Sequence, residues 1–251
     1  MANLLIYPLY RINGRNEEFL KHKKFVEKNI EIVNKFNCVD DIIVLTKEVS
    51  NWSDMIGDIF HSIQKLVQSG NNVLFSEADT IFLKPFDEIY SIDKMMMFSN
   101  CGESSNIDLS LSEEYYLNGG FVYYPHNISD NIWSYIKRID FSDTIKNIGN
   151  TYEVIVNQMY YSQFADKEMG INFLKKFGIF KYNWRCLSYS DTMNIRHIHF
   201  LNMSYYTSDK KFFSFWYENF FDEMYEHIMN NKSCNHVIVD MFNFCKNQDN
   251  N

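Results

Sequence analysis

The chain has 251 residues, of which 46% are hydrophobic and 17% aromatic, and its formal net charge at pH 7 is −8. This composition supports a sizeable buried core and argues against intrinsic disorder. No apolar run reaches the roughly 20 residues of a membrane helix. The acidic balance disfavours a nucleic-acid partner, which needs a basic face, although segment 21–24 is locally basic. The cysteines are odd in number and lack CxxC spacing, which favours reduced thiols and a cytoplasmic location.

Apolar periodicity in the first third of the chain alternates between strand-like and helix-like segments. The predicted order is strand 4–7, helix 17–36, strand 41–46, helix 53–68 and strand 73–75. This alternation predicts an α/β fold with a parallel sheet and right-handed crossovers. We expect strand 41–46 to be fully buried because it is a continuous β-branched run. We expect Ser53 or Asp54 to cap the second helix and Gly70 to end it.

The third predicted strand opens onto an acidic triplet, Glu77-Ala78-Asp79. Residues i and i+2 of an extended segment point the same way, so these carboxylates converge and repel each other unless a proton or cation compensates. A divalent cation with oxygen ligands is one explanation, and a solvated acidic turn is the alternative. Ligands of parallel sheets bind beyond the carboxyl ends of the strands, an edge that Tyr10 and Arg11 would share.

The second half of the chain is less regular and contains two further polar signals. Its predicted elements are strands near 95–98 and 115–124, and helices at 129–139, 152–164 and 210–228. Asn118-Gly119-Gly120 interrupts an aromatic strand, which indicates either a bulge or a close approach of another group. His197 and His199 alternate along a later extended segment, so they share one face. Either imidazole could complete a site begun by the carboxylates.

The segment 72–90 resembles the metal-binding segment of GT-A glycosyltransferases, in particular the glycogenin and galactosyltransferase-type families. In those families an apolar strand, D-x-D, a short apolar strand and Lys-Pro follow one another, as they do here up to Lys84-Pro85. Glu77 stands where the families usually carry Asp. The resemblance implies a single GT-A-like domain over 1–251. Its nucleotide-binding half would span 3–90, and 91–251 would form the donor-sugar and acceptor half with the C-terminal helices.

The resemblance also implies roles for individual residues. It implies Glu77, Asp79 and His199 as metal ligands, with His199 favoured over His197 as the late His-aromatic pair. It implies that Tyr10 and Arg11 contact the nucleotide and that Asn118 and Gly119 lie under the donor sugar. It implies that Asn157 and Gln158 point at the sugar hydroxyls and the reacting face. Lys210 or Lys211 would contact the diphosphate. Asn157 replaces the family's Asp, and the Gly-x-x-Lys-Pro-Trp sequence that usually supplies the lysine is missing. The stretch 182–184 is similar to an Asn-aromatic segment of the relatives.

These features predict a metal-dependent glycosyltransferase that uses Mn²⁺ or Mg²⁺. It would move a sugar from a nucleotide-diphosphate sugar, with UDP favoured, to an acceptor hydroxyl on a glycan, lipid, protein or modified nucleic acid. A nucleotidyltransferase is the first alternative, although only 11–15 faintly resembles its basic phosphate loop. A non-catalytic sugar-nucleotide-binding protein is the second, because two family carboxylate positions are altered.

Overall fold

The structure is a computed structural model that describes residues 1–99, 117–137, 148–176, 195–200 and 210–248. The described strands are β1 (Asn3–Ile12), β2 (Asp41–Val49), β3 (Asn72–Ser76), β4 (Thr80–Phe82), β5 (Met96–Ser99), β6 (Leu117–Tyr124) and β7 (His197–His199). The described helices are α1 (Asn16–Phe36), α2 (Trp52–Gln68), α3 (Ser134–Lys137), α4 (Ile148–Tyr161), α5 (Lys167–Lys175), α6 (Lys210–Met229) and α7 (Asn235–Gln248), with 3₁₀ turns at η1 (Asp87–Ser91) and η3 (Asp130–Trp133).

The central sheet has the strand order β2-β1-β3-β6-β5. Strand β1 runs parallel to both neighbours, with Leu5 between Ile42 and Leu74, whereas β6 and β5 pair antiparallel. A second, two-stranded sheet joins β4 to β7. The α/β class and the parallel arrangement of the first three strands are therefore confirmed.

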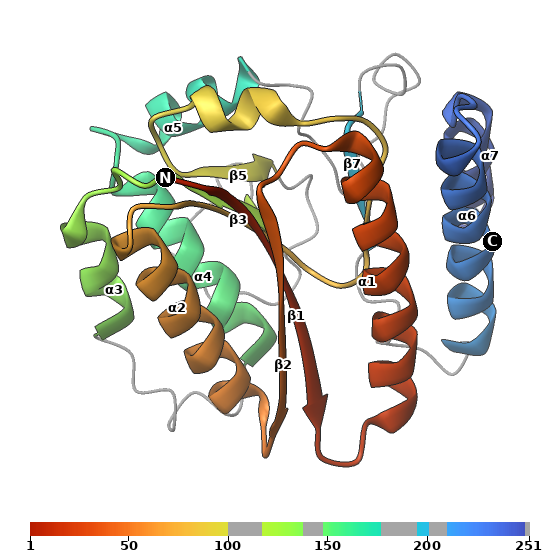
Figure 1. Ribbon diagram of the computed structural model, residues 1–251, viewed down its shortest axis with the longest axis horizontal. Coiled ribbons are helices and arrows are strands. Elements are labelled where there is room, and N and C mark those ends of the chain that lie inside the picture. Colours follow the sequence, from red (N-terminus) through yellow and green to blue (C-terminus); the bar gives the residue numbers. More distant parts are fainter. Residues whose placement is uncertain (100–116, 138–147, 177–194, 201–209, 249–251) are drawn as a thin grey trace.

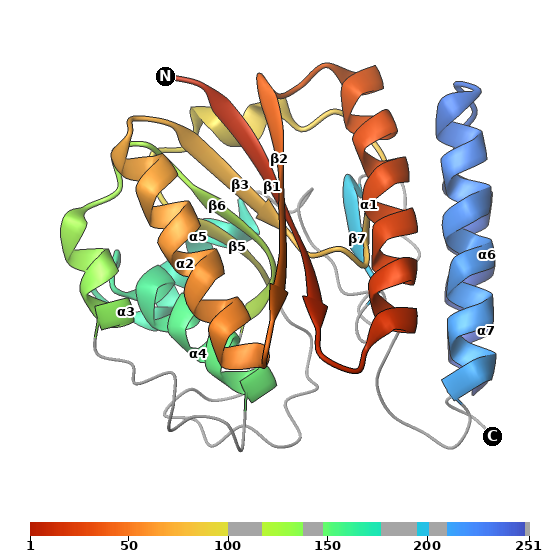
Figure 2. The ribbon, with the colours of Figure 1, turned by 60° about the horizontal axis from the view of Figure 1, so that its bottom comes forward.

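The helices cover both faces of the central sheet (Figures 1 and 2). Helix α2 lies on one face together with α3 and α4, and α1 lies on the other, with α6 and α7 beyond it. The chain leaves β1 for β2 and then crosses back over β1 to β3, so the strand order reverses between β1 and β3. A crevice at the carboxyl ends of these two strands is where doubly wound sheets bind ligands.

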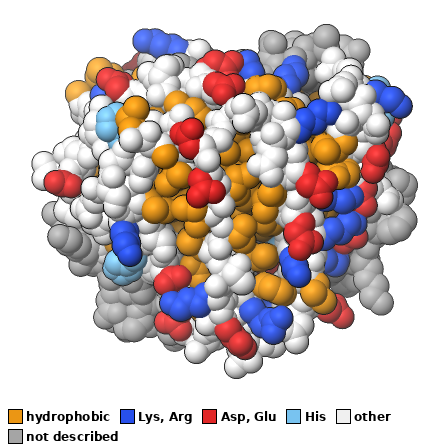
Figure 3. Space-filling view, viewed as in Figure 1, with side chains coloured by type: hydrophobic (Ala, Val, Ile, Leu, Met, Phe, Trp, Pro, Cys, Tyr) orange, Lys and Arg blue, Asp and Glu red, His pale blue; other side chains and the backbone are white. Residues whose placement is uncertain are grey.

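Strand β2 differs from the sequence expectation because it lies at the edge of the described sheet. Among the described strands it pairs only with β1, its centre is half-buried, and segment 46–48 is exposed. In Figure 3, apolar side chains gather along the middle of the face, where β2 and β1 lie in Figure 1. The prediction of full burial was wrong because a β-branched run does not distinguish an edge strand from a central one.

Two helix boundaries also differ from the expected ones. Asn51, rather than Ser53 or Asp54, caps α2, since its side chain accepts a hydrogen bond of 3.0 Å from the backbone N–H of Asp54. The helix expected over 129–139 is described only as the short elements η3 and α3 up to residue 137. Gly70 does follow the end of α2, with a left-handed φ of 85°.

The described helices include none with the length and apolar character that a membrane crossing requires. Cys38 and Cys234 are free thiols, and both are buried.

Candidate metal centre

The acidic turn between β3 and β4 is fixed on several sides by backbone hydrogen bonds. The N–H of Glu77 donates to the carbonyl of Gly120 in β6 at 2.8 Å, and the N–H of Phe200 donates to the carbonyl of Asp79 at 2.9 Å. The Thr80 hydroxyl donates to the Glu77 carbonyl at 2.8 Å. The turn is therefore held between β6 and the end of β7, at the switch point of the sheet.

Asn29 anchors the same turn from helix α1. Its side chain is fully buried, its amide donates to the Thr80 carbonyl, and its oxygen accepts from the Phe82 N–H at 3.3 Å. The sequence analysis did not single out this residue. The available signal was a polar residue on the apolar face of α1, between Val26 and Ile32.

Three side chains converge where this turn meets β7. Strand β7 pairs antiparallel with β4, and Thr80 lies opposite His199. The His199 Nε2 atom is 2.9 Å from Glu77 Oε2 and 3.1 Å from Asp79 Oδ1. His199 and Asp79 are buried, whereas the Glu77 side chain is 37% exposed. The group is therefore open to solvent on the Glu77 side.

The second nitrogen of His199 is held by Asn118. Its Nδ1 lies 2.9 Å from Asn118 Oδ1, which can only accept, so Nδ1 carries the proton of this hydrogen bond. In a neutral imidazole this arrangement leaves the Nε2 lone pair directed at the carboxylates. A histidine that donates its other N–H to a fixed oxygen is the usual arrangement of a metal ligand.

The glycines of β6 make room for this contact. Met97 of β5 pairs with Val122, but the next residue, Phe98, pairs with Asn118, so 119–121 form a bulge in β6. A Cβ atom on Gly120 would lie 2.4 Å from the His199 ring. The segment Asn118-Gly119-Gly120 therefore has both features that the sequence offered as alternatives: a bulge, and the close approach of another group, which is the His199 ring.

The geometry and chemistry of the group fit a divalent cation. Ligand atoms of Glu77, Asp79 and His199 all lie within 4.8 Å of one another. Adjacent ligands of an octahedral ion with bonds of about 2.1 Å lie about 3 Å apart, close to the two separations from Nε2. Two carboxylates and one imidazole suit Mn²⁺ and Mg²⁺, which favour oxygen, with the nitrogen favouring Mn²⁺.

Mutual charge compensation shapes the protonation of the group. Burial raises the pKa of Asp79, but the charge and hydrogen bond of His199 outweigh burial and lower this pKa to about 2. Burial lowers the pKa of His199, but the Asp79 charge and the hydrogen bonds to Asp79 and Glu77 raise it to about 10. The proton on Nε2 thus compensates the carboxylates, and a divalent cation would serve the same purpose.

His197 shares the strand face of His199 but has a different environment. Its ring lies 4.7 Å from the Phe82 ring and 4.6 Å from the Phe121 ring, and Nε2 is 3.2 Å from the Ser76 hydroxyl. Burial, together with the charge of His199, holds the pKa of His197 well below its ordinary value. The structure therefore groups His199, and not His197, with the carboxylates.

Helix α4 supports the site through a residue that the sequence analysis did not identify. Glu153 Oε1 accepts from Asn118 Nδ2 at 3.2 Å and from the Gly119 N–H at 3.3 Å. One turn later, Asn157 is fully buried, and its amide bonds to both backbone groups of Leu117 at 2.8 Å. Asn157 therefore holds β6 in place, and contact with a sugar would require breaking these bonds. The signal available in the sequence was that Glu153 lies four residues before Asn157, so both side chains share one face of the helix.

The remaining predicted site residues make other contacts. The Tyr10 ring is 8% exposed and its hydroxyl donates to Asp58 at 2.6 Å, whereas exposed Arg11 lies over the Phe19 ring at 4.9 Å. Both lie at the carboxyl end of β1, as expected. Gln158 is exposed on α4. Lys210 begins α6, but its side chain and those of Lys211 and 182–184 lie outside the described set.

No protein-family model matches the chain, and no curated protein matches it. Solved structures do match, and two of them align with the chain over 90% and 92% of its length. A glycosyltransferase involved in the glycosylation of the major capsid of PBCV-1 is 13% identical, with a TM-score of 0.40, over 90% of this chain and 98% of that chain. The apo-form glycosyltransferase GlyE of Streptococcus pneumoniae TIGR4 is 10% identical, with a TM-score of 0.42, over 92% of this chain and 64% of that chain. At these scores the functional assignment rests on the residues of the site.

Proposed function

We propose that the protein is a metal-dependent glycosyltransferase that uses a nucleotide-diphosphate sugar, with UDP favoured, as donor. The observation that carries this proposal is the convergence of Glu77, Asp79 and His199 at the switch point of the sheet. The sequence motif around the two carboxylates supports the same reaction class, because it resembles the GT-A metal-binding segment.

Glu77, Asp79 and His199 would hold the cation, and Mn²⁺ suits this donor set better than Mg²⁺. When bound, it would act as a Lewis acid toward the diphosphate and stabilise the charge of the leaving nucleoside diphosphate. Asn118 orients the His199 ring through Nδ1. The partly exposed Glu77 carboxylate marks the side from which the diphosphate would enter.

Glu153 and Asn157 act as positioning residues in this proposal. Glu153 holds the Asn118 amide and the Gly119 backbone, and Asn157 holds the adjacent Leu117 backbone. Together they keep the bulged segment of β6 against the metal ligands. We assign donor contact to the Asn118 and Gly119 part of this segment, next to the metal ligands, and leave the exposed Gln158 as the α4 residue available to a bound sugar.

The reaction class is tested by incubating the purified protein with Mn²⁺ and a panel of nucleotide sugars. A glycosyltransferase releases UDP or another nucleoside diphosphate, slowly to water and faster with an acceptor. Release of pyrophosphate from a nucleoside triphosphate and a sugar phosphate would indicate a nucleotidyltransferase instead. Metal-dependent binding of the donor with no product would indicate a non-catalytic binding protein.

A further inference from the structure

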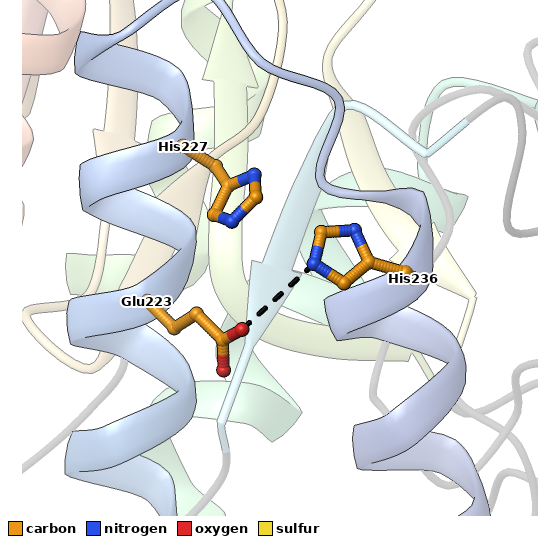
Figure 4. A group of neighbouring side chains, drawn as sticks. All are labelled: Glu223, His227 and His236. Atoms are coloured by element: carbon orange, nitrogen blue, oxygen red, sulfur yellow. Dashed lines mark ion pairs between the residues drawn. The ribbon is translucent and has the colours of Figure 1, made fainter.

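A second group of ligand-type side chains lies far from the carboxylate turn in sequence, on the C-terminal helix pair. Glu223 and His227 lie one turn apart on α6, and His236 lies in the first turn of α7 (Figure 4). Ligand atoms of these three residues all lie within 4.8 Å of one another. The group contains two imidazoles and one carboxylate, a different donor set from that of the first centre.

The tautomer of His227 leaves a nitrogen available for a metal ion. Its Nδ1 lies 3.1 Å from the carbonyl oxygen of Ser233, in the turn between the helices. Since a carbonyl can only accept, Nδ1 carries the proton, and in the neutral ring Nε2 keeps its lone pair. A backbone carbonyl that fixes the second nitrogen of a histidine is the common outer contact of zinc ligands.

The other two side chains are close but weakly paired. His236 Nε2 lies 3.8 Å from Glu223 Oε1, and both side chains are about half exposed. The two imidazole rings are 4.6 Å apart and inclined by 62°, so they do not stack face to face. A tetrahedral ion with bonds of about 2.1 Å holds its ligand atoms about 3.4 Å apart. Small rotations of these exposed side chains would therefore close the site.

The backbone that carries the three ligands is already fixed. The Lys232 N–H donates to the His227 carbonyl at 2.7 Å, and Asn231 closes α6 in the left-handed region with a φ of 57°. On either side of this turn a side chain is fully buried, Met224 of α6 before it and Val237 of α7 after it. The hairpin therefore holds His236 beside Glu223 and His227 without a metal ion, which reduces the ordering that binding requires.

We propose that Glu223, His227 and His236 form a Zn²⁺ site that links α6 to α7. Two histidines and a glutamate, with water in the fourth position, form a well-known zinc donor set, and imidazole nitrogens favour Zn²⁺ over Mn²⁺ or Mg²⁺. The ion would clamp the helix pair and stabilise it. This proposal is independent of the reaction assigned to the first centre.

The test is a calorimetric Zn²⁺ titration of metal-free full-length protein, with Co²⁺ absorption as the probe of tetrahedral coordination. Replacing a ligand by His227→Gln or His236→Gln is expected to weaken one Zn²⁺-binding event by more than about tenfold. It should also remove the corresponding rise in melting temperature. His61→Gln is the matched control, because His61 also points Nδ1 at a backbone carbonyl on an exposed helix surface.

Asp79→Asn separates the two centres, since it is expected to remove Mn²⁺ binding and leave this Zn²⁺-binding event in place. Circular dichroism confirms that each variant is folded. The proposal is overturned if wild-type protein binds no Zn²⁺. It is also overturned if folded His227→Gln and His236→Gln proteins bind Zn²⁺ with wild-type affinity and stoichiometry.

Discussion

At the scale of single residues, the first centre depends on one amide, that of Asn118. Its oxygen accepts from His199 and from the Gly120 N–H, while its nitrogen donates to Glu153. The amide therefore fixes the orientation and tautomer of the histidine that faces the carboxylates. The sequence placed Asn118 in an interrupted strand and beneath a donor sugar, but not beside His199, because spacing carries no information about which ring nitrogen an amide contacts.

Truncation of that amide should weaken metal binding without removing any ligand. We expect Asn118→Ala to reduce Mn²⁺ affinity by about 10- to 100-fold, the usual effect of losing an outer contact to a histidine ligand. Calorimetric titration with Mn²⁺ measures this. Asn127→Ala, at an exposed loop position, is the control. Unchanged affinity in Asn118→Ala would show that Asn118 does not orient the ligand.

The two histidines of β7 should separate metal binding from stability. His199→Ala should weaken Mn²⁺ binding in the presence of UDP by more than about tenfold, because it removes a ligand. His197→Ala should leave a cavity beside Phe82 and Phe121 and reduce the free energy of unfolding by about 2 to 4 kcal/mol. Titration and denaturant unfolding of both variants measure the two effects. If only the folded His197 variant loses the metal, the assignment is reversed.

At the scale of elements, periodicity predicted the alternation of strands and helices well, and tertiary context decided the rest. The apolar faces of α1 and α2 can be read from spacing because each packs on the sheet. The exposed edge of β2 and the packing of α6 against α1 depend on partners distant in sequence. For α6, these include the Phe25 and Phe221 rings, whose centroids lie 4.4 Å apart, and two ion pairs, from Lys24 and from Lys28 to Asp222.

These two ion pairs predict a pH dependence for the α1–α6 contact. Burial raises the pKa of Asp222, but hydrogen bonds from Lys24 and Lys28 outweigh burial and lower it. A carboxyl group with a lowered folded-state pKa stabilises the fold above its unfolded-state pKa, and this stabilisation is lost as the pH falls through the folded-state value. At neutral pH we expect Asp222→Asn to lower the free energy of unfolding by about 0.5 to 1 kcal/mol, since both ion pairs are partly exposed.

Urea unfolding of wild-type and Asp222→Asn protein at neutral pH and through a series of acidic pH values measures the difference. The two proteins should differ at neutral pH and converge as the pH falls through the lowered pKa of Asp222, whereas Asp240→Asn, at an exposed position on α7, should match wild type throughout. A difference that persists unchanged in acid would rule out the ion pairs as its source.

At the scale of the whole molecule, the sequence predicted the α/β class and brought Glu77, Asp79 and His199 into one hypothesis. It could do so because the carboxylates follow a recognisable strand and the histidine follows in the order of the resembled family. The supporting residues Asn29 and Glu153 were missed, since each acts from a helix packed across the sheet. Asn157 was assigned to the sugar because an Asn-Gln pair in a sequence does not reveal which side chain is buried.

A cation held by Glu77, Asp79 and His199 should change how the stability of the whole protein responds to UDP. We expect UDP to raise the melting temperature only with Mn²⁺ present, because ligand binding to the folded state stabilises it by mass action and the diphosphate would bind through the metal. Differential scanning fluorimetry with UDP, with and without EDTA, measures this. An equal shift in both conditions would contradict a metal-bridged diphosphate.

The central claim, that Glu77 and Asp79 hold a catalytic cation, is tested most directly by nucleoside-diphosphate release from the donor. We expect Asp79→Asn to lower the rate by at least about 100-fold, because the amide removes a charge that holds the cation. Glu77→Asp should retain or improve activity, and Asp240→Asn should match wild type. Circular dichroism controls for folding. If folded Asp79→Asn protein turns over at the wild-type rate, the metal-dependent glycosyltransferase assignment is contradicted.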